Sequence, residues 1–331
     1  MRRLAFLAAL LLCPGSSPGG QAPARRAPDK PAGPQRVRLQ PQFVPGRVMR
    51  YQMEFRTTTA GHRSGLVEDP QGPSRLEVTW SSIVRIDVLA AADGVTRLRT
   101  TYEKSVATAR SDTFDPEAEE IEKQYHNLEG HAIEFTVNAE GKTGEVKGLQ
   151  DILDDAKAAD AARESLTQLA KSTSLPREGI VPGQKWSSEQ PAASAPLAGI
   201  EMRSESTYLR DERCRPAESS TALPPRARVV EQACAVILTR FRMSQPRTPR
   251  DPTPEEYRKS GLRTAGRWSG SGESLAYISL RTGWVVSVTQ SGEQDMDVTV
   301  STRDGGSGVR YAGQVRSQSQ ITLLPDSSPV H

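Results

Sequence analysis

Few residues in this sequence of 331 combine the type and the spacing that catalysis or metal binding requires. His126 and His131 flank Glu129, a set that could bind zinc, yet it matches no HExxH motif or other zinc-site spacing. The nucleophile pattern G-x-S-x-G occurs at 15–19, where no strand precedes it and a proline follows the serine. We therefore predict no catalytic residue, no metal site and no cofactor.

Acidic residues are numerous, but no pair of them is marked for catalysis. Asp154 with Asp155, and Asp295 with Asp297, could supply an acid and a base for hydrolysis. The segment 111–123 is rich in carboxylates, which calcium accepts as ligands, but it lacks the spacing of an EF-hand. We interpret this segment as a solvent-exposed loop. A hydrolase with dispersed carboxylates stays open as an alternative function.

Two cysteines, Cys214 and Cys234, remain if an N-terminal leader that contains Cys13 is removed. Residues 206–213 and 229–243 have the composition of strands and are joined by a proline-containing loop. A hairpin of these strands would bring the two cysteines opposite each other, and thiol pairs in exported proteins are usually oxidised. The sequence predicts a disulfide between Cys214 and Cys234, with two unpaired, partly buried thiols as the alternative.

The N-terminus has the composition of a secretory signal peptide, because two arginines precede an apolar run, 4–12, that small residues follow. A helix of that length rises about 14 Å, well short of the roughly 30 Å of a bilayer's hydrocarbon core. We predict a signal peptide over 1–24, export to the periplasm or the extracellular space, and no transmembrane segment. Lipid attachment at Cys13 is the less favoured alternative.

The segments that flank the folded part are polar and poor in bulky apolar residues. Residues 25–42 are rich in Pro, Gly, Ala, Arg and Gln, which predicts a disordered tether, and 326–331 are interpreted as a disordered tail. The net charge of the chain is +3, so its overall electrostatics give no reason to expect a nucleic acid partner.

From residue 43 onward the dominant pattern is alternation of apolar and polar residues. Residues 76–88 alternate without a break, and 95–106 and 133–137 repeat the pattern after turn signals. Further strands are predicted at 229–243, 274–280, 284–289, 295–301 and 309–324. The polar segment 245–259 is interpreted as an exposed loop. The pattern predicts a mainly β fold (α+β) built from antiparallel meanders.

One segment has the spacing of a helix instead. Between 149 and 170, Leu, Ile and Ala recur every three or four residues, and no Gly or Pro interrupts them. We predict a long amphipathic helix and linker over 149–175 that lies between two β repeats and covers a sheet face.

Two short motifs occur twice, which favours an internal duplication. Val-Pro-Gly at 44–46 reappears at 181–183, and the second copy is followed by Trp186. A set with identical internal spacing, Gly, aromatic, Gly and Val, occurs at 130–146 and at 272–288. The residues to which we assign a structural role in the repeats are Pro45, Gly46, Pro182, Gly183, Trp186, Gly130, Gly141, Gly272 and Gly283.

With its leader, its repeated Val-Pro-Gly turn and a Pro…Gly-x-x-Trp segment at Pro176, Gly183 and Trp186, the chain resembles an uncharacterised family of exported bacterial β-rich proteins. The resemblance spans about 43–324 and implies the β fold, but it brings no known activity.

The predicted domain organisation is two tandem repeats of curved antiparallel sheet, 43–148 and 176–325, separated by the helix. Long strands with one apolar face must bury that face against the helix, the other repeat or a ligand. We therefore expect an exported, non-enzymatic binding protein that holds an apolar ligand or a lipid in a sheet concavity. A structural or protein-interaction module, for example one that binds another envelope protein, is the alternative.

Overall fold

The computed structural model describes residues 36–66, 72–113, 116–138, 143–152, 175–176, 178–192, 196–214, 233–247, 249–304 and 307–325. These residues form one antiparallel sheet of 11 strands, which confirms the mainly β prediction. The strands are β1 (Val48–Gly65), β2 (Ser74–Ala92), β3 (Val95–Ser111), β4 (Ala132–Asn138), β5 (Thr143–Lys147), β6 (Lys185–Pro191), β7 (Glu201–Arg213), β8 (Ala233–Ser244), β9 (Leu262–Ser279), β10 (Val285–Thr302) and β11 (Gly308–Leu323). The helices in these ranges are α1 (Pro116–His126), the 3-10 helix η2 (Leu149–Asp151) and α3 (Glu255–Lys259).

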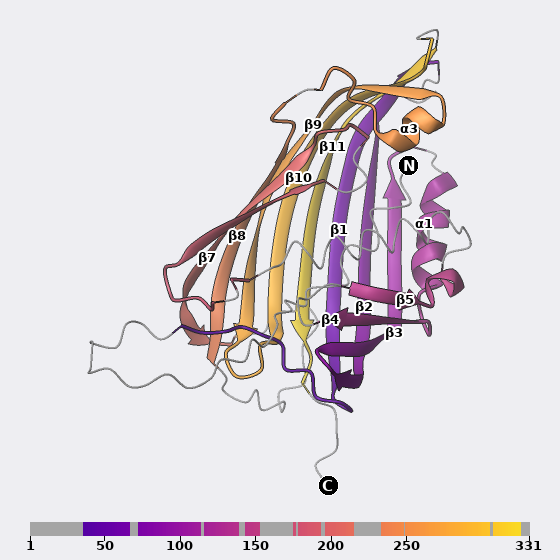
Figure 1. Ribbon diagram of the computed structural model, residues 1–331. Coiled ribbons are helices and arrows are strands. Elements are labelled where there is room, and N and C mark those ends of the chain that lie inside the picture. Colours follow the sequence, from indigo (N-terminus) through magenta and orange to yellow (C-terminus); the bar gives the residue numbers. More distant parts are fainter. Residues whose placement is uncertain are drawn as a thin grey trace.

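The chain runs from the middle of the sheet to one edge, and then from the other edge back to the middle. The strand order is β5-β4-β3-β2-β1-β11-β10-β9-β8-β7-β6. The two runs meet where β1 pairs with β11, from Tyr51 opposite Leu323 to Gly65 opposite Val309. Figure 1 shows a curved sheet in which β7 to β10 slant relative to β1 to β3. The expectation of two separate sheets is therefore corrected to one continuous sheet.

Alternation along the strands places one face of the sheet, which we call the core face, against a hydrophobic core. Along β2 every second residue from Leu76 to Val88 is buried. β2 and β3 are joined by a tight turn at Asp93 and Gly94, whose φ angles of 51° and 72° suit a two-residue hairpin. The core extends across most strands, so that Phe135 on β4 and Tyr208 on β7 belong to the same cluster.

The end of the predicted tether is part of this core. Leu39 is 4% exposed, and the backbone of Val37 pairs with that of Ile180 through hydrogen bonds of 2.8 and 2.9 Å. Phe43 contacts Trp284 edge to face, with ring centroids 5.1 Å apart. The folded part of the chain therefore begins before residue 43. The rest of the tether (25–35), the signal peptide (1–24) and the tail (326–331) lie outside the described residues.

The acidic segment expected to be an exposed loop instead forms α1, which covers the core face beside β3 (Figure 1). Tyr125 of α1 is 4% exposed, and Ala118, Ile121 and Leu128 pack against the same core. The short helix α3 likewise lies within the expected loop at 245–259. Of the long helix predicted from residue 149, only η2 is described, and 153–174 lie outside the described residues.

A second, smaller cluster of buried residues lies on the core face near the opposite end of the strands. It contains Leu197, Ile200, Met243 and Val298, with Trp268 and Met296 partly buried against them. No helix in the described ranges is long and apolar enough to cross a membrane.

Candidate functional site

The face of the sheet opposite the core carries rows of side chains that cross many strands, because the registers of successive strand pairs align. The row that we call the Leu238 rung consists of Val106, Ser81, Glu54, Gln320, Thr289, Leu275 and Leu238. The adjacent Arg240 rung consists of Thr108, Thr79, Arg56, Gln318, Ser291, Glu273, Arg240 and Glu205. The next, the Arg242 rung, consists of Glu77, Thr58, Arg316, Glu293, Ser271, Arg242 and Arg203.

These three rungs form the floor of a concave surface. A cavity of about 1080 Å³ is lined by the Arg240 and Arg242 rungs from β1 to β7. A second cavity of about 770 Å³ is lined by the Leu238 and Arg240 rungs from β3 to β8. The two share Arg56, Glu273, Ser291 and Gln318, so they form one trough. Twist accumulated across a wide sheet curves its surface in this way.

At one end of the trough the side chains of the same face become buried. The next row of the same face contains Val236, Ser287 and Thr322, whose exposed fractions are only 1%, 3% and 3%. On the Leu238 rung, by contrast, Val106 is 40% exposed, and Leu238 and Leu275 are partly exposed opposite each other. The accessible apolar side chains therefore lie at the end of the trough next to this buried row.

Charged side chains occupy the rest of the trough, with five arginines and three glutamates lining the larger cavity. Arg240 forms an ion pair of 3.8 Å with Glu273, and Arg56 one of 2.9 Å with Glu77. These side chains are largely exposed, so their ion pairs stabilise the fold only weakly. The trough thus combines a small apolar patch with an excess of positive charge.

Glycines behind the trough explain how the sheet bends there. The ring of Phe241 lies over Gly272 and Gly292 on the core face, in space that a Cβ atom at Gly272 would occupy. At the β1–β11 pair, a Cβ atom on Gly61 would lie 3.1 Å from the Cα of Gly313. Because glycine has no Cβ atom, it lets neighbouring strands approach closely and lets an aromatic ring pack over the backbone.

The residues of the repeated Val-Pro-Gly motif occupy two turns with the same hydrogen bonds. The amide of Gly46 donates to the carbonyl oxygen of Val88, and that of Gly183 donates to Tyr208. Both glycines have positive φ angles, 80° and 85°, which glycine tolerates without strain. Pro45 and Pro182 precede them just before β1 and β6, and Trp186 on β6 is partly buried against the core.

The second repeated motif occupies unlike positions. Gly130 lies in the turn between α1 and β4, whereas Gly272 lies within β9. Gly283 lies in the β9–β10 turn with a φ angle of 67°, and its backbone is in close contact with that of Gln40. Its predicted counterpart, Gly141, lies outside the described residues.

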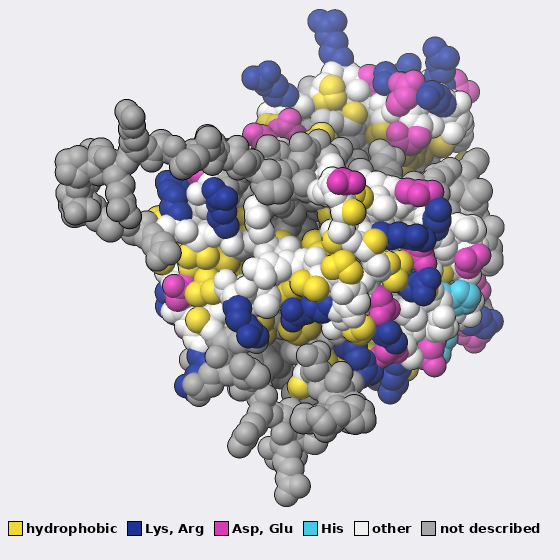
Figure 2. Space-filling model, turned by 60° about the horizontal axis from the view of Figure 1, so that its bottom comes forward, with side chains coloured by type: hydrophobic (Ala, Val, Ile, Leu, Met, Phe, Trp, Pro, Cys, Tyr) yellow, Lys and Arg dark blue, Asp and Glu magenta, His cyan; other side chains and the backbone are white. Residues whose placement is uncertain are grey.

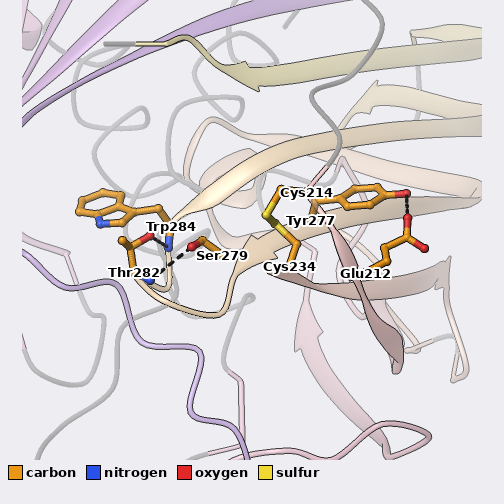
Figure 3. The surroundings of a disulfide bond; sticks show 7 residues. All are labelled: Glu212, Cys214, Cys234, Tyr277, Ser279, Thr282 and Trp284. Carbon is orange, nitrogen blue, oxygen red and sulfur yellow. Dashed lines mark hydrogen bonds between the residues drawn. A yellow bond between two sulfur atoms is a disulfide. The ribbon is translucent and has the colours of Figure 1, made fainter. Parts of the chain in front are cut away.

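The two cysteines are joined by a disulfide, with Cα atoms 4.9 Å apart. Figure 3 shows this bond next to Tyr277, whose hydroxyl donates to Glu212 at 2.9 Å. Cys234 lies opposite Glu212 at the end of the β7–β8 pair, and Cys214 follows the last residue of β7. The bond therefore ties the ends of these two strands, as the sequence pattern predicts.

Several groups that could do chemistry have structural partners instead. Asp297 accepts two hydrogen bonds from Arg310, at 2.7 and 2.8 Å, which lower the pKa of its carboxyl. Glu129 accepts from the amide of Ser105, and the ring of His126 contacts the carbonyl oxygen of Glu122. Within the described ranges, no three His, Cys, Asp or Glu residues are arranged to hold a metal ion. Asp154 and Asp155 lie outside those ranges.

Lys and Arg side chains do not gather into a single patch on the bottom face of the molecule. In Figure 2 they alternate there with acidic and hydrophobic side chains among the described residues. A nucleic acid partner would favour a continuous basic surface.

Sequence reasoning did not identify the trough residues. Alternation assigns Arg203, Arg240 and Arg242 to one face of their strands, but nothing in the sequence indicates that this face is concave. Only the pairing of β7, β8 and β9 aligns these side chains with those of β1 and β11.

No family model matches the chain, and no curated protein does. Among solved structures, lipovitellin, from a study of its lipid–protein interactions, matches with a TM-score of 0.42 and 11% identity. That match covers 88% of this chain but only 26% of the lipovitellin chain.

The outer membrane protein OprG from Pseudomonas aeruginosa matches with a TM-score of 0.16 and 7% identity, over 85% of this chain and 96% of that chain. An outer membrane channel from Pseudomonas putida F1 matches with a TM-score of 0.19 and 8% identity, over 86% and 97%. Because all three TM-scores lie below 0.5, none of these likenesses bears on function.

Proposed function

We propose that this protein is an exported, non-enzymatic binding protein that holds an amphipathic ligand, such as a lipid, in the trough. The observation that supports this proposal is the composition of the trough, in which the Leu238–Leu275 pair lies beside two arginine-containing rungs. Ligand sites are concave, with apolar contact area and a few polar groups that fix orientation.

Export is supported by the disulfide, because such bonds persist mainly in oxidising compartments.

A purely apolar ligand would leave the arginines without a role. A ligand that has both an apolar chain and a polar end uses both parts of the trough, so the expectation of an apolar ligand or a lipid is narrowed to an amphiphile.

Two other functions predict different results. A hydrolase needs an acid and a base close together near a substrate, but in the trough Glu273 is ion-paired to Arg240 at 3.8 Å. A protein-interaction module needs no small-molecule ligand at all. Its purified form would carry no bound lipid and would rebind none.

Native mass spectrometry of the purified protein, before and after delipidation, tests the proposal. We expect a bound species that is lost on delipidation and regained when a single-chain phospholipid is added. Leu238→Asn combined with Leu275→Asn should weaken rebinding, whereas Leu209→Asn, an exposed leucine on β7 outside the trough, should not. The absence of any bound or rebindable lipid would contradict the proposal.

A further inference from the structure

The Arg242 rung contains two arginines directly opposite each other on neighbouring strands, Arg203 on β7 and Arg242 on β8. Side chains at such positions have Cβ atoms roughly 5 Å apart, and like charges placed opposite each other are destabilising. Both residues line the larger cavity of the trough. Among the described residues, no carboxylate forms an ion pair with either of them.

The described acidic residues on β6 and β7 form no ion pair with either arginine. Glu189 lies opposite Arg203 on β6, but its carboxyl is hydrogen-bonded to that of Glu201, which raises the pKa of Glu201. Glu205, one rung away, lies opposite Arg240 rather than opposite the pair. The pair therefore presents two guanidinium groups to the trough, and no residue in the described ranges forms an ion pair with them.

The same face of the sheet contains a second arginine pair, which serves as an internal comparison. Arg50 on β1 lies opposite Arg85 on β2, outside the trough. There the protein supplies both counter-charges, since Arg50 binds Glu103 at 2.6 Å and Arg85 binds Asp87 at 2.7 Å. In this pair, carboxylates of the protein neutralise both arginines.

We propose that Arg203 and Arg242 form an anion subsite that binds the phosphate head group of the amphiphile whose chain lies against Leu238 and Leu275. This inference rests on the proposed function of the trough and specifies the charge of its ligand. Guanidinium groups bind phosphate oxygens through paired hydrogen bonds, so two of them can hold one head group. Along β8, Arg242 lies four residues from Leu238, about 13 Å. The alkyl chain of a common lipid spans that distance.

The test measures binding to delipidated protein by titration calorimetry with three probes. Dodecyl phosphate has an anionic head, dodecyl maltoside has the same chain with a neutral head, and inorganic phosphate has no chain. We expect dodecyl phosphate to bind most tightly and inorganic phosphate most weakly. In the variant Arg203→Gln/Arg242→Gln, the affinity for dodecyl phosphate should fall roughly tenfold or more, while that for dodecyl maltoside stays unchanged.

The matched control is Arg50→Gln/Arg85→Gln, which removes the same charge from the same face outside the trough and should leave all three affinities unchanged. Circular dichroism verifies that both variants are folded. Equal weakening of both amphiphiles, or of neither, would overturn the subsite but not the trough as a binding site. Inorganic phosphate that binds as tightly as dodecyl phosphate would indicate a site for free anions and overturn the head-group assignment. If the unaltered protein binds neither amphiphile, the proposed function itself fails.

Discussion

Trp80 on β2 and Tyr125 on α1 lie with ring centroids 5.4 Å apart, and the hydroxyl of Ser105 links them. The indole nitrogen of Trp80 donates to this hydroxyl at 2.9 Å, and the hydroxyl donates to the carbonyl oxygen of Tyr125 at 2.6 Å. Ser105 is completely buried on β3. These contacts attach α1 to the core face of the sheet at one point.

Replacing Ser105 with alanine should destabilise the protein by about 1 to 3 kcal/mol, because it leaves the buried indole N–H of Trp80 without its acceptor. Urea denaturation, followed by tryptophan fluorescence, measures the effect. The control is Ser81→Ala, on the exposed face of β2, which should change stability by no more than about 0.5 kcal/mol. Equal effects of the two variants would contradict this account.

Glu122 of α1 accepts a hydrogen bond of 2.7 Å from the backbone amide of Ala109, beyond the last residue of β3 that pairs with β4. Its carboxylate thus takes the place of a neighbouring strand. Glu122→Ala should lower the free energy of unfolding by about 1 to 2 kcal/mol and speed the exchange of the Ala109 amide proton. Glu120→Ala, an exposed change on the same helix, serves as the control. Unaltered exchange at Ala109 would argue against this role.

The disulfide closes a loop between cysteines that are 20 residues apart in the sequence. A cross-link of this length stabilises a protein by about 3 kcal/mol, chiefly by restricting the unfolded chain. The variant Cys214→Ala/Cys234→Ala should therefore unfold at a lower denaturant concentration than the oxidised protein. Reduction should have the same effect on the unaltered protein and none on the variant. A reductant that shifts both equally would point to another cause.

Glu134 on β4 accepts hydrogen bonds from Arg99 and Arg97, which lower the pKa of its carboxyl. Because this pKa is lower in the folded than in the unfolded chain, the contribution to stability is complete above the ordinary carboxyl value. It is lost as the pH falls through the folded pKa. Both arginine side chains are about half exposed, and solvent screening limits this contribution to about 1 kcal/mol.

The variant Glu134→Gln should consequently lose less stability than the unaltered protein between about pH 5 and about pH 3. Urea denaturation at several pH values measures the difference, and Glu119→Gln, on the exposed part of α1, should follow the unaltered protein. Parallel curves for Glu134→Gln and the unaltered protein would exclude the contribution.

Several strands were predictable because alternation is a local property, but β1 and β6 were not predicted, and β10 is one strand where the pattern predicts two, 284–289 and 295–301. β2 occupies 74–92 where the pattern predicts 76–88, and β11 occupies 308–323 where it predicts 309–324. The pairing of β1 with β11 was not predictable, because it joins residues 244 to 272 positions apart, from Gly65 and Val309 to Tyr51 and Leu323, through backbone hydrogen bonds that carry no sequence signal.

The helix α1 was missed because its many carboxylates were interpreted as a sign of solvent exposure. Its apolar residues Ala118, Ile121 and Tyr125, and Leu128 just after the helix, recur at helical spacing, and this signal could have identified it. Two acidic residues of this region, Glu122 and Glu129, accept hydrogen bonds from backbone amides of β3. The sequence shows that this segment is rich in carboxylates, but only the packing of α1 against β3 shows which groups they bind.

The central position of β1 and β11 has a consequence for how the molecule must assemble. Until β11 has been synthesised, β1 and β10 each lack a neighbour, and both are 18 residues long. Such unpaired edges invite association with other chains. Pairings between distant segments also form slowly. Completion of the sheet therefore waits for its final strand, and a nascent or truncated chain that lacks 308–323 should be a target for chaperones.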